Sequence, residues 1–346
     1  MAETTPLGET GIPIRAESMQ MVQLLAGFQL SQALYVMAKL GVATVLADGP
    51  RPVEELVTAT DANPDALRRL LRYLTQFGIF RTAGKDVVQV TPLGLTLAEG
   101  QPGSVRDAAL YWMETHYGPF GELLHTARTG EPAACRHLGE PFFEWIAADP
   151  ELAALQNRAM ANVAAGLEAS MFEGYRLPGD GGTVADIGGS DGSVLVQLLA
   201  GDPGRRGIVF DLPEVVQAAG EVLSRAALAD RVEIVAGDFF TSVPVADIYV
   251  LSFILHDWDN ESCARILRSV AGAAAPGARL VLIEMVLPDG DEPHLAKMMD
   301  LVMLAMLAGR ERTAEEYRAL LARSGFTLDR IVGSRSPYSF IEATRD

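Results

Sequence analysis

The second half of the chain alternates short runs of β-branched and apolar residues with stretches of helical pattern. After "PGDGG" come "TVADIGG", "GIVFDLP", "VEIVAGDFF", "DIYVLSF" and "ARLVLIEMVLP", with room for a helix between runs. Strands that alternate with helices pair in parallel and carry helices on both faces of the sheet. The tail "FTLDRIVGSRSPYSFIEATRD" holds two more runs, close enough for an antiparallel hairpin at the sheet edge. We therefore predict an α/β domain with a mostly parallel sheet over residues 179–346.

The N-terminal part reads as a separate, mostly helical domain. Residues 18–40 are rich in Met, Leu, Val and Ala, contain no Pro and precede a glycine, which indicates one long helix. In "DANPDALRRLLRYLTQFGIF", Asn63 fits an N-cap and Pro64 the first helical position. The strand-like "DVVQV" completes an order of helix, turn, helix and hairpin that resembles a winged helix. We expect this domain to span residues 1–105 and a helical bridge to span residues 106–178.

The charge of the chain argues against nucleic acid and membrane surfaces as partners. The formal net charge is −17 at pH 7, which repels phosphate backbones and anionic lipids. Arg68, Arg69 and Arg72 lie on one face of the predicted third helix of the winged helix. They would meet DNA in a repressor, whereas elsewhere they only keep a helix face in water, and the acidic charge favours the second interpretation.

The chain shows no sign of export or of a metal cluster. Its start, "MAETTPLGETGIPIR", lacks the basic and apolar segments of a signal peptide, and no run of about 18 uncharged apolar residues follows. Cys135 and Cys263 are the only cysteines, too few for a metal cluster or a disulfide framework. We expect a cytoplasmic protein that works without a metal.

A glycine-rich turn ends the first strand of the predicted sheet. It contains Asp186, Gly188 and Gly189, and in open α/β sheets ligands bind at the carboxyl ends of the strands. Ser190 and Ser193 stand where the dinucleotide fingerprint needs its second and third glycines, so a pyrophosphate fits poorly. A nucleoside ligand without phosphates remains compatible with this turn.

The next two strands also end in acids. Asp211 in "VFDLP" follows the second strand, where a carboxylate can accept hydrogen bonds from both hydroxyls of a ribose. In "GDFF", Asp238 can accept from the exocyclic amine of an adenine while Phe239 stacks on the base. Each acid alone fits a helix N-cap equally well. Three acids at the ends of three successive strands favour an adenosine ligand.

Six motifs in order connect the sequence to one family. They are "ADIGGSDG", "FDLPEVV", "GDFF", "LHDW", "IEMVLPDG" and "GRERTAEEYRALLARSGF". In this order and near this spacing they resemble the dimeric small-molecule O-methyltransferases, typified by plant caffeate and flavonoid enzymes and by bacterial antibiotic-tailoring relatives. The resemblance covers almost the whole chain. It implies a Rossmann-like class I methyltransferase domain, an N-terminal dimerisation domain, a homodimer, and S-adenosylmethionine as cofactor.

The resemblance assigns the chemistry to a histidine and two acids. His256 falls on the general base, and Glu284 and Glu311 fall on the acidic positions that flank it, which leaves open which acid orients the ring. A phenol has a pKa near 10 in water, so a base with a pKa near 6.5 can take up its proton as the oxygen attacks the methyl group. The expected acceptor is a hydroxyl of an aromatic specialised metabolite.

The resemblance also assigns the cofactor contacts. It places Gly188 and its loop at the methionine part, Asp211 at the ribose, and Asp238 with Phe239 at the adenine. Trp258 follows His256 closely enough to close over the adenosine side. Asp186, Gly189 and Leu212 are further cofactor-binding candidates. Ser252 stands where plant members carry a basic residue. The contact to the cofactor carboxylate is therefore open between Ser252 and Arg158.

An apolar wall for the acceptor is expected ahead of Glu311. In "KMMDLVMLAMLAG", Met299, Met303 and Met306 recur at helical spacing, a pattern that fits a core stripe or a substrate wall. The resemblance favours the wall. Further wall candidates are Met160, Trp112 and Met113.

Two other functions remain as alternatives. Some relatives bind the cofactor without transferring its methyl group and act as hydroxylases or decarboxylases, but the retained His256 argues against this chemistry. The winged-helix pattern also leaves a ligand-sensing DNA-binding regulator as the second alternative.

Overall fold

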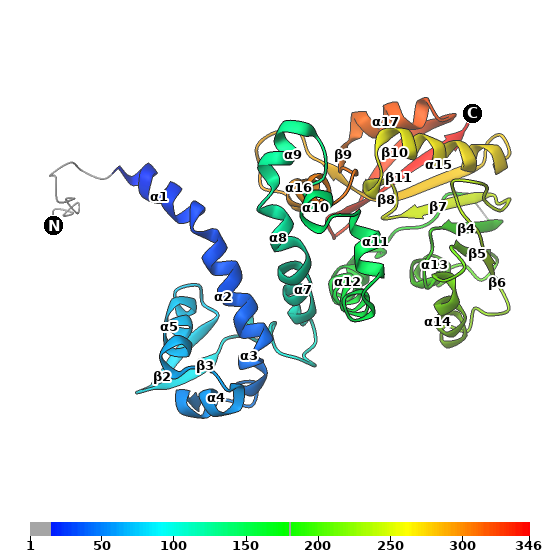
Figure 1. Ribbon diagram of the computed structural model, residues 1–346. Helices are drawn as coiled ribbons and strands as arrows, with labels where there is room; N and C mark the ends of the chain where they lie inside the picture. Colours follow the sequence, from blue (N-terminus) through cyan, green and yellow to red (C-terminus); the bar gives the residue numbers. More distant parts are fainter. Residues whose placement is uncertain (1–14, 180) are drawn as a thin grey trace, which may run out of the picture. The chain divides into compact units, whose positions relative to one another are not determined.

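The computed structural model describes residues 15–179 and 181–346, with only the backbone of residues 161–170 (Figure 1). The chain divides into two compact units, Met1–Gly118 with Ile146–Gly166, and Pro119–Trp145 with Leu167–Asp346. The predicted helical bridge contributes to both units. The boundaries at residues 105 and 178 stay a prediction.

The first unit is helical with a small antiparallel sheet. Its elements are α1 (Ala16–Leu25), α2 (Gly27–Lys39), α3 (Val42–Val45), β1 (Arg51–Pro52), α4 (Val53–Thr60), α5 (Pro64–Thr75), β2 (Phe80–Gly84), β3 (Val87–Val90), α6 (Pro92–Leu95), α7 (Arg106–Tyr111), the π-helix η1 (Trp112–His116) and most of α12 (Pro150–Met171). The sheet order is β1-β3-β2. Asn63 caps α5 as predicted, because its side chain accepts from the backbone N–H groups of Asp65 and Ala66.

The apolar N-terminal segment forms two helices rather than the single one expected. The chain leaves the helix at Ala26, where ψ is 2°, and Gly27, a weak helix former, follows. By length and composition, Ala16–Lys39 is apolar enough to cross a membrane, yet only 17% of its most apolar window is buried. Leu24 and Leu25 are 67% and 70% exposed. The described residues of α1 thus present an apolar surface.

The second unit contains the predicted sheet. Its strands are β4 (Thr183–Ile187), β5 (Arg206–Asp211), β6 (Val232–Ala236), β7 (Ile248–Ser252), β8 (Arg279–Leu287), β9 (Arg312–Thr313), β10 (Phe326–Gly333) and β11 (Tyr338–Arg345). Its helices are α9 (Leu123–Thr129), α10 (Ala133–Leu138), α13 (Ser193–Leu199), η2 (Val216–Ala218), α14 (Ala219–Arg225), η3 (Leu255–Asp257), α15 (Asn260–Ala273), α16 (Leu295–Met306) and α17 (Ala314–Ala322), while α8 (Tyr117–Phe120) and α11 (Phe142–Ala147) cross the unit boundary. The strand order is β10-β11-β8-β7-β4-β5-β6, with β8 to β6 parallel and β10–β11 an antiparallel edge hairpin. The predicted α/β architecture is confirmed.

Two apolar cores hold this sheet between helices. One core packs α15 and α17 against one face, through residues such as Leu267 and Leu320, and the other packs α13 and α14 against the opposite face, through Leu195 and Leu223. The chain order reverses between β4 and β7, because β5 and β6 lie on one side of β4 and β7 and β8 on the other. Such a switch point leaves a crevice at the carboxyl ends of the strands, where ligands bind.

Candidate active site

The glycine-rich turn after β4 is built for close approach. Gly188 has a φ of 74°, and a Cβ there would lie 2.4 Å from Cδ1 of Ile254. The backbone N–H of Gly188 donates to the carbonyl of Phe210 at 2.8 Å, and that of Ser190 donates to Oδ2 of Asp211 at 2.9 Å. Ser190 takes a φ of 49°, in the left-handed region that usually favours glycine. The turn is thereby tied to the end of β5.

Two buried polar side chains near this turn lack partners. Both carboxylate oxygens of Asp186 and the hydroxyl of Ser252 have no hydrogen bond within the described residues, although Asp186 is fully buried. Burial, with the negative charges of Asp211 and Asp191, raises the pKa of Asp186 to about 7. Orphaned buried groups of this kind are costly, and a ligand that supplies hydrogen-bond partners would satisfy them.

The acids after β5 and β6 are oriented by the backbone. Oδ1 of Asp211 accepts from the N–H of Leu212 at 2.7 Å, and Oδ1 of Asp238 accepts from the N–H of Phe240 at 2.8 Å. Phe239 lies with Phe240 and Trp258 in an aromatic cluster, with Phe240 and Trp258 4.8 Å apart, edge to face. The structure thus brings the predicted adenine residues and Trp258 together.

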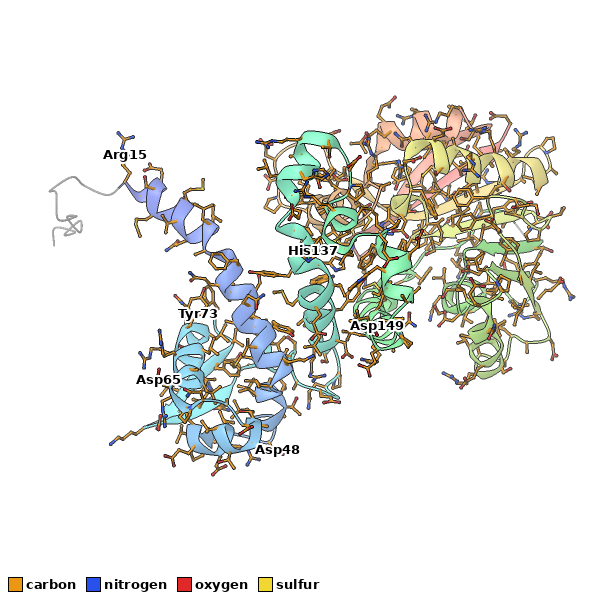
Figure 2. The ribbon with its side chains drawn as sticks, viewed as in Figure 1. Arg15, Asp48, Asp65, Tyr73, His137 and Asp149 are labelled. Carbon is orange, nitrogen blue, oxygen red and sulfur yellow. The ribbon has the colours of Figure 1, made fainter. Side chains whose placement is uncertain are left out.

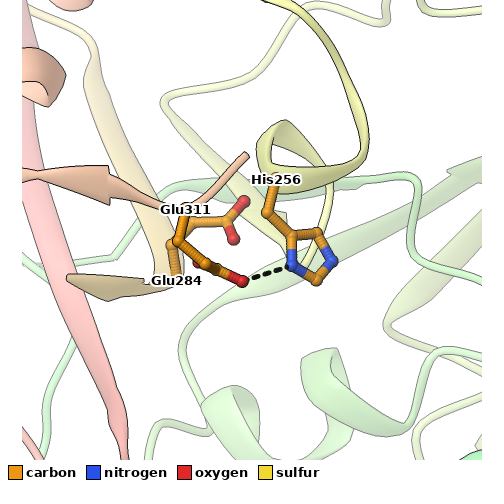
Figure 3. A group of neighbouring side chains, drawn as sticks. All are labelled: His256, Glu284 and Glu311. Atoms are coloured by element: carbon orange, nitrogen blue, oxygen red, sulfur yellow. Dashed lines mark hydrogen bonds and ion pairs between the residues drawn. The ribbon is translucent and has the colours of Figure 1, made fainter. Parts of the chain in front are cut away.

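His256 lies in the short helix η3, which is joined to β7 by Phe253 and Ile254. Its Nδ1 is 3.0 Å from Oε1 of Glu311, a hydrogen bond that Figure 3 shows. Its Nε2 is 3.4 Å from Oδ1 of Asp257, longer than a good hydrogen bond. The imidazole is half-buried, whereas Glu311 is almost fully buried. Of the two acids between which the sequence left the choice open, Glu311 is the one within hydrogen-bond distance of the ring.

Glu284 holds the backbone beside the histidine. Its Oε1 accepts from the N–H groups of Ile254 at 3.1 Å and Leu255 at 2.7 Å. Phe253 stands before them with a φ of 58°, a costly conformation for an aromatic residue that occurs at functional sites. Two successive N–H groups that share one carboxylate fix the start of the segment 253–258, which we call the His256 loop.

Three carboxylates surround the imidazole and change its protonation. Burial alone would lower the pKa of His256, but the charges of Asp257, Glu284 and Glu311 outweigh it and raise the pKa to about 10. Burial raises the pKa of Glu284 to about 7. The pKa of His256 is thus shifted upward from the value near 6.5 of an isolated imidazole. Ligand atoms of His256, Glu284 and Glu311 lie within 4.8 Å of one another, as a metal site requires, so the metal-free site stays a prediction.

Two family models match the chain. Residues 120–327 match the O-methyltransferase domain, and residues 22–100 match the O-methyltransferase dimerisation domain. The chain belongs to the O-methyltransferase family. The predicted family, enzyme class and cofactor, S-adenosylmethionine, are thereby confirmed.

Two related proteins and one crystal structure are similar to this O-methyltransferase over most of its length. It is 39% identical to a phenazine O-methyltransferase of Lysobacter antibioticus over 324 residues, which cover 93% of this chain and 95% of the relative. It is 32% identical to an aclacinomycin 10-hydroxylase of Streptomyces purpurascens, over 98% of this chain and 93% of that protein. The crystal structure of an O-methyltransferase from neocarzinostatin biosynthesis, in complex with S-adenosylmethionine and 2-hydroxy-5-methyl naphthoic acid, aligns with a TM-score of 0.78 at 33% identity, covering 92% of this chain and 96% of that one.

The three methionines predicted to form the acceptor wall differ in burial. Met303 and Met306 on α16 are buried in the second unit, and Met299 is half-buried. The exposed apolar residues of α16 are Met298, Leu301 and Leu304, which sequence reasoning did not single out. A stripe of methionines alone does not tell which face of a helix meets the core.

The other wall candidates belong to the first unit. Trp112 and Met113 lie in the π-helix η1, and Met160 on α12 is 43% exposed. Arg158 lies in the same unit and pairs with Asp107 at 3.8 Å. The roles of these four residues in the site stay a prediction, because they belong to the first unit and His256 to the second.

Three residues of the site were missed from the sequence. Asp257 lies against Nε2, Oδ1 of Asp300 accepts from the N–H of Glu311 at 3.0 Å, and the guanidinium of Arg312 contacts the His256 loop. Asp257 and Arg312 stand inside the motifs "LHDW" and "GRERT", which was the available signal. Asp300 offered none, because it lies within an apolar helix.

Proposed function

We propose that this enzyme transfers the methyl group of S-adenosylmethionine to a hydroxyl of an aromatic specialised metabolite, with His256 as the proton acceptor. The contact between Glu311 and Nδ1 carries the proposal. A carboxylate at Nδ1 fixes the ring and leaves Nε2 to exchange a proton with an acceptor hydroxyl.

The residues after β4 to β7 fit the cofactor. Gly188 leaves space that a side chain would fill, and Asp186 and Ser252 offer buried polar atoms without partners. Asp211 suits the ribose, and Asp238 suits the adenine beside the aromatic cluster. When bound, S-adenosylmethionine supplies an electrophilic methyl group on a sulfonium.

The proton route follows from the electrostatics. Once the complex has released one proton to solvent, Nε2 is free to accept the proton of the acceptor hydroxyl, and the imidazolium that forms is stabilised by the carboxylates of Glu311, Asp257 and Glu284. The carboxylates raise the pKa of His256, which favours transfer of the phenolic proton to Nε2 over its transfer to an isolated imidazole. The proton later leaves to solvent.

We propose further that the enzyme is a cytoplasmic homodimer. The dimerisation domain match and the exposed apolar side chains of α1 support this assembly. Tyr73 of α5, labelled in Figure 2, also lines a groove with Ala33 and Val36 of α2, a surface that a second chain can fill. Arg68 pairs with Asp86 and Arg69 with Asp65, which reduces the basic face a DNA-binding regulator would need.

The identity to a hydroxylase supports a second candidate function. A chain 32% identical to an aclacinomycin 10-hydroxylase could bind the cofactor and keep its methyl group. The two functions differ in product, because only methyl transfer converts the cofactor to S-adenosylhomocysteine.

The deciding experiment measures product and variant together. Hydroxylated naphthoates and phenazines are incubated with the enzyme, and mass spectrometry follows methylated acceptor and S-adenosylhomocysteine. His256→Gln should lower turnover roughly 10²- to 10⁴-fold. The matched control is His137→Gln, at an exposed histidine of α10 (Figure 2), which should keep full activity. Full activity of His256→Gln on a neutral phenol would sink the base role.

A further inference from the structure

Residues 309–312 follow α16 and lie directly against the His256 loop; we call them the clamp. A Cβ at Gly309 would lie 1.9 Å from the carbonyl oxygen of His256, so only glycine permits this approach. The N–H of Arg310 donates to the same carbonyl at 2.8 Å, and Glu311 contacts the ring. The backbone and the imidazole of His256 are thus held by neighbouring residues of one segment.

Arg312 extends the clamp along the loop. Its Nη1 donates to the carbonyl of Leu255 at 2.8 Å and its Nη2 to the carbonyl of Trp258 at 2.9 Å. Its Nε donates to Oδ1 of Asn260 at 3.1 Å, and Nη2 also contacts Sγ of Cys263. One planar guanidinium therefore holds the residue before His256 and the residue that faces the expected adenosine.

The clamp itself is anchored to the sheet. Arg312 and Thr313 form β9, which pairs in parallel with Val286 and Leu287 of β8. Thr313 then caps α17 in a capping box with Glu316. β8 also carries Glu284. The positions of Glu284 and Glu311 relative to His256 are therefore both set by this strand.

The burial of Arg312 is expensive for a purely structural role. The side chain is fully buried, and its hydrogen-bond partners within the described residues are neutral carbonyls, an amide and a thiol. Taking a charged group out of water costs free energy that its hydrogen bonds must offset. A guanidinium is suited to this place because it holds several carbonyls in fixed directions at once.

We propose that Arg312 is a positioning residue, which sets His256 and Trp258 in one geometry and so couples the placement of the base to cofactor binding. This inference rests on the proposed role of His256. Nothing in it requires Arg312 to touch the acceptor.

The test compares Arg312→Lys and Arg312→Met with Arg318→Met in the full-length enzyme. Arg318 is exposed on α17 and pairs only with the adjacent-turn Glu315 among the described residues, so its variant should match the wild type. Arg312→Lys keeps the charge but loses the fork. It should lower kcat roughly 10- to 100-fold, the scale of a misplaced catalytic group. It should also weaken S-adenosylmethionine binding about fivefold or more in calorimetry, as a shift of Trp258 requires.

The pH profile separates positioning from charge. The groups that face His256 are Asp257, Glu284 and Glu311. If Arg312→Met loosens the Glu311 contact, the inflection in kcat/KM should move to lower pH, because the imidazolium loses its partner. If Arg312 acts only through its charge, removal of a cation moves the inflection to higher pH, and that result would overturn the proposal.

A milder variant keeps the test independent of folding. Asn260 is exposed, and Asn260→Ala removes one partner of the guanidinium. It should lower kcat and weaken S-adenosylmethionine binding, as Arg312→Lys does, but by only roughly two- to threefold. The inflection in kcat/KM should move to lower pH, as in Arg312→Met. Wild-type values in both Arg312→Lys and Asn260→Ala would contradict the positioning role, even if His256→Gln is inactive. An active His256→Gln would instead refute the base, while the cofactor affinity of Arg312→Lys would still report on Trp258.

Discussion

Oε1 of Glu311 lies 3.0 Å from Nδ1 of His256, whereas Oε1 of Glu284 accepts from two backbone N–H groups next to that histidine. Two acids that look equivalent in the sequence therefore do different work. Glu311 acts on the ring directly and Glu284 on the loop that carries it. Their variants should differ accordingly.

Glu311→Gln should lower kcat more than Glu284→Gln. A glutamine at 311 cannot stabilise the imidazolium with a charge, so we expect a loss of roughly 10- to 100-fold, the scale of a charged hydrogen bond. At 284 the amide oxygen can still accept from Ile254 and Leu255, and the loss should be several times smaller. Steady-state kinetics at saturating cofactor measures both. A larger loss of kcat in Glu284→Gln than in Glu311→Gln would show that Glu284 is the acid that stabilises the imidazolium.

The rate should rise with pH across the neutral range. Neighbouring carboxylates raise the pKa of His256 to about 10, so its imidazole is protonated at pH 7 in the ligand-free enzyme. The complex with a neutral phenol must therefore lose one proton before methyl transfer. For a neutral phenol, log kcat/KM should climb with a slope of about one from about pH 7 to about pH 9. For an acceptor already ionised at pH 7, log kcat/KM should not change with pH over this range. The phenolate then binds beside the imidazolium, and no proton has to be lost. A plateau beginning near pH 6.5 would show an unperturbed histidine.

Strand ends were predictable from the sequence, and contacts between loops were not. Asp211, Asp238 and His256 could be placed because parallel strands deliver their carboxyl ends to one edge. The partner of Nδ1 could not, because Glu311 arrives from the segment after α16, whose path no periodicity encodes. The burial of Arg312 could not be predicted either. An arginine is usually exposed, whereas this side chain is fully buried.

Asp211→Ala should weaken S-adenosylmethionine without unfolding the enzyme. Its carboxylate has the ribose role proposed above and also ties Ser190 of the glycine-rich turn to β5. Loss of such charged hydrogen bonds costs about 1.5 to 3 kcal/mol, or roughly 10- to 150-fold in Kd. Isothermal titration calorimetry gives the affinity and circular dichroism the fold. Glu233→Ala, at an exposed acid of β6, is the control. Equal affinity in Asp211→Ala and the wild type would remove Asp211 from the site.

Leu25→Glu should convert the enzyme to a monomer. The side chain is 70% exposed on α1, and an apolar surface of this kind must be covered in the assembled protein. A carboxylate buried there without a partner costs several kcal/mol, enough to dissociate a dimer at micromolar concentration. Val245→Glu makes the same change at a residue of the second unit that is 76% exposed, and should leave the mass of the particle unchanged. Light scattering distinguishes the outcomes. A wild-type enzyme that is monomeric and sediments with lipid vesicles would show instead that Ala16–Lys39 meets a membrane.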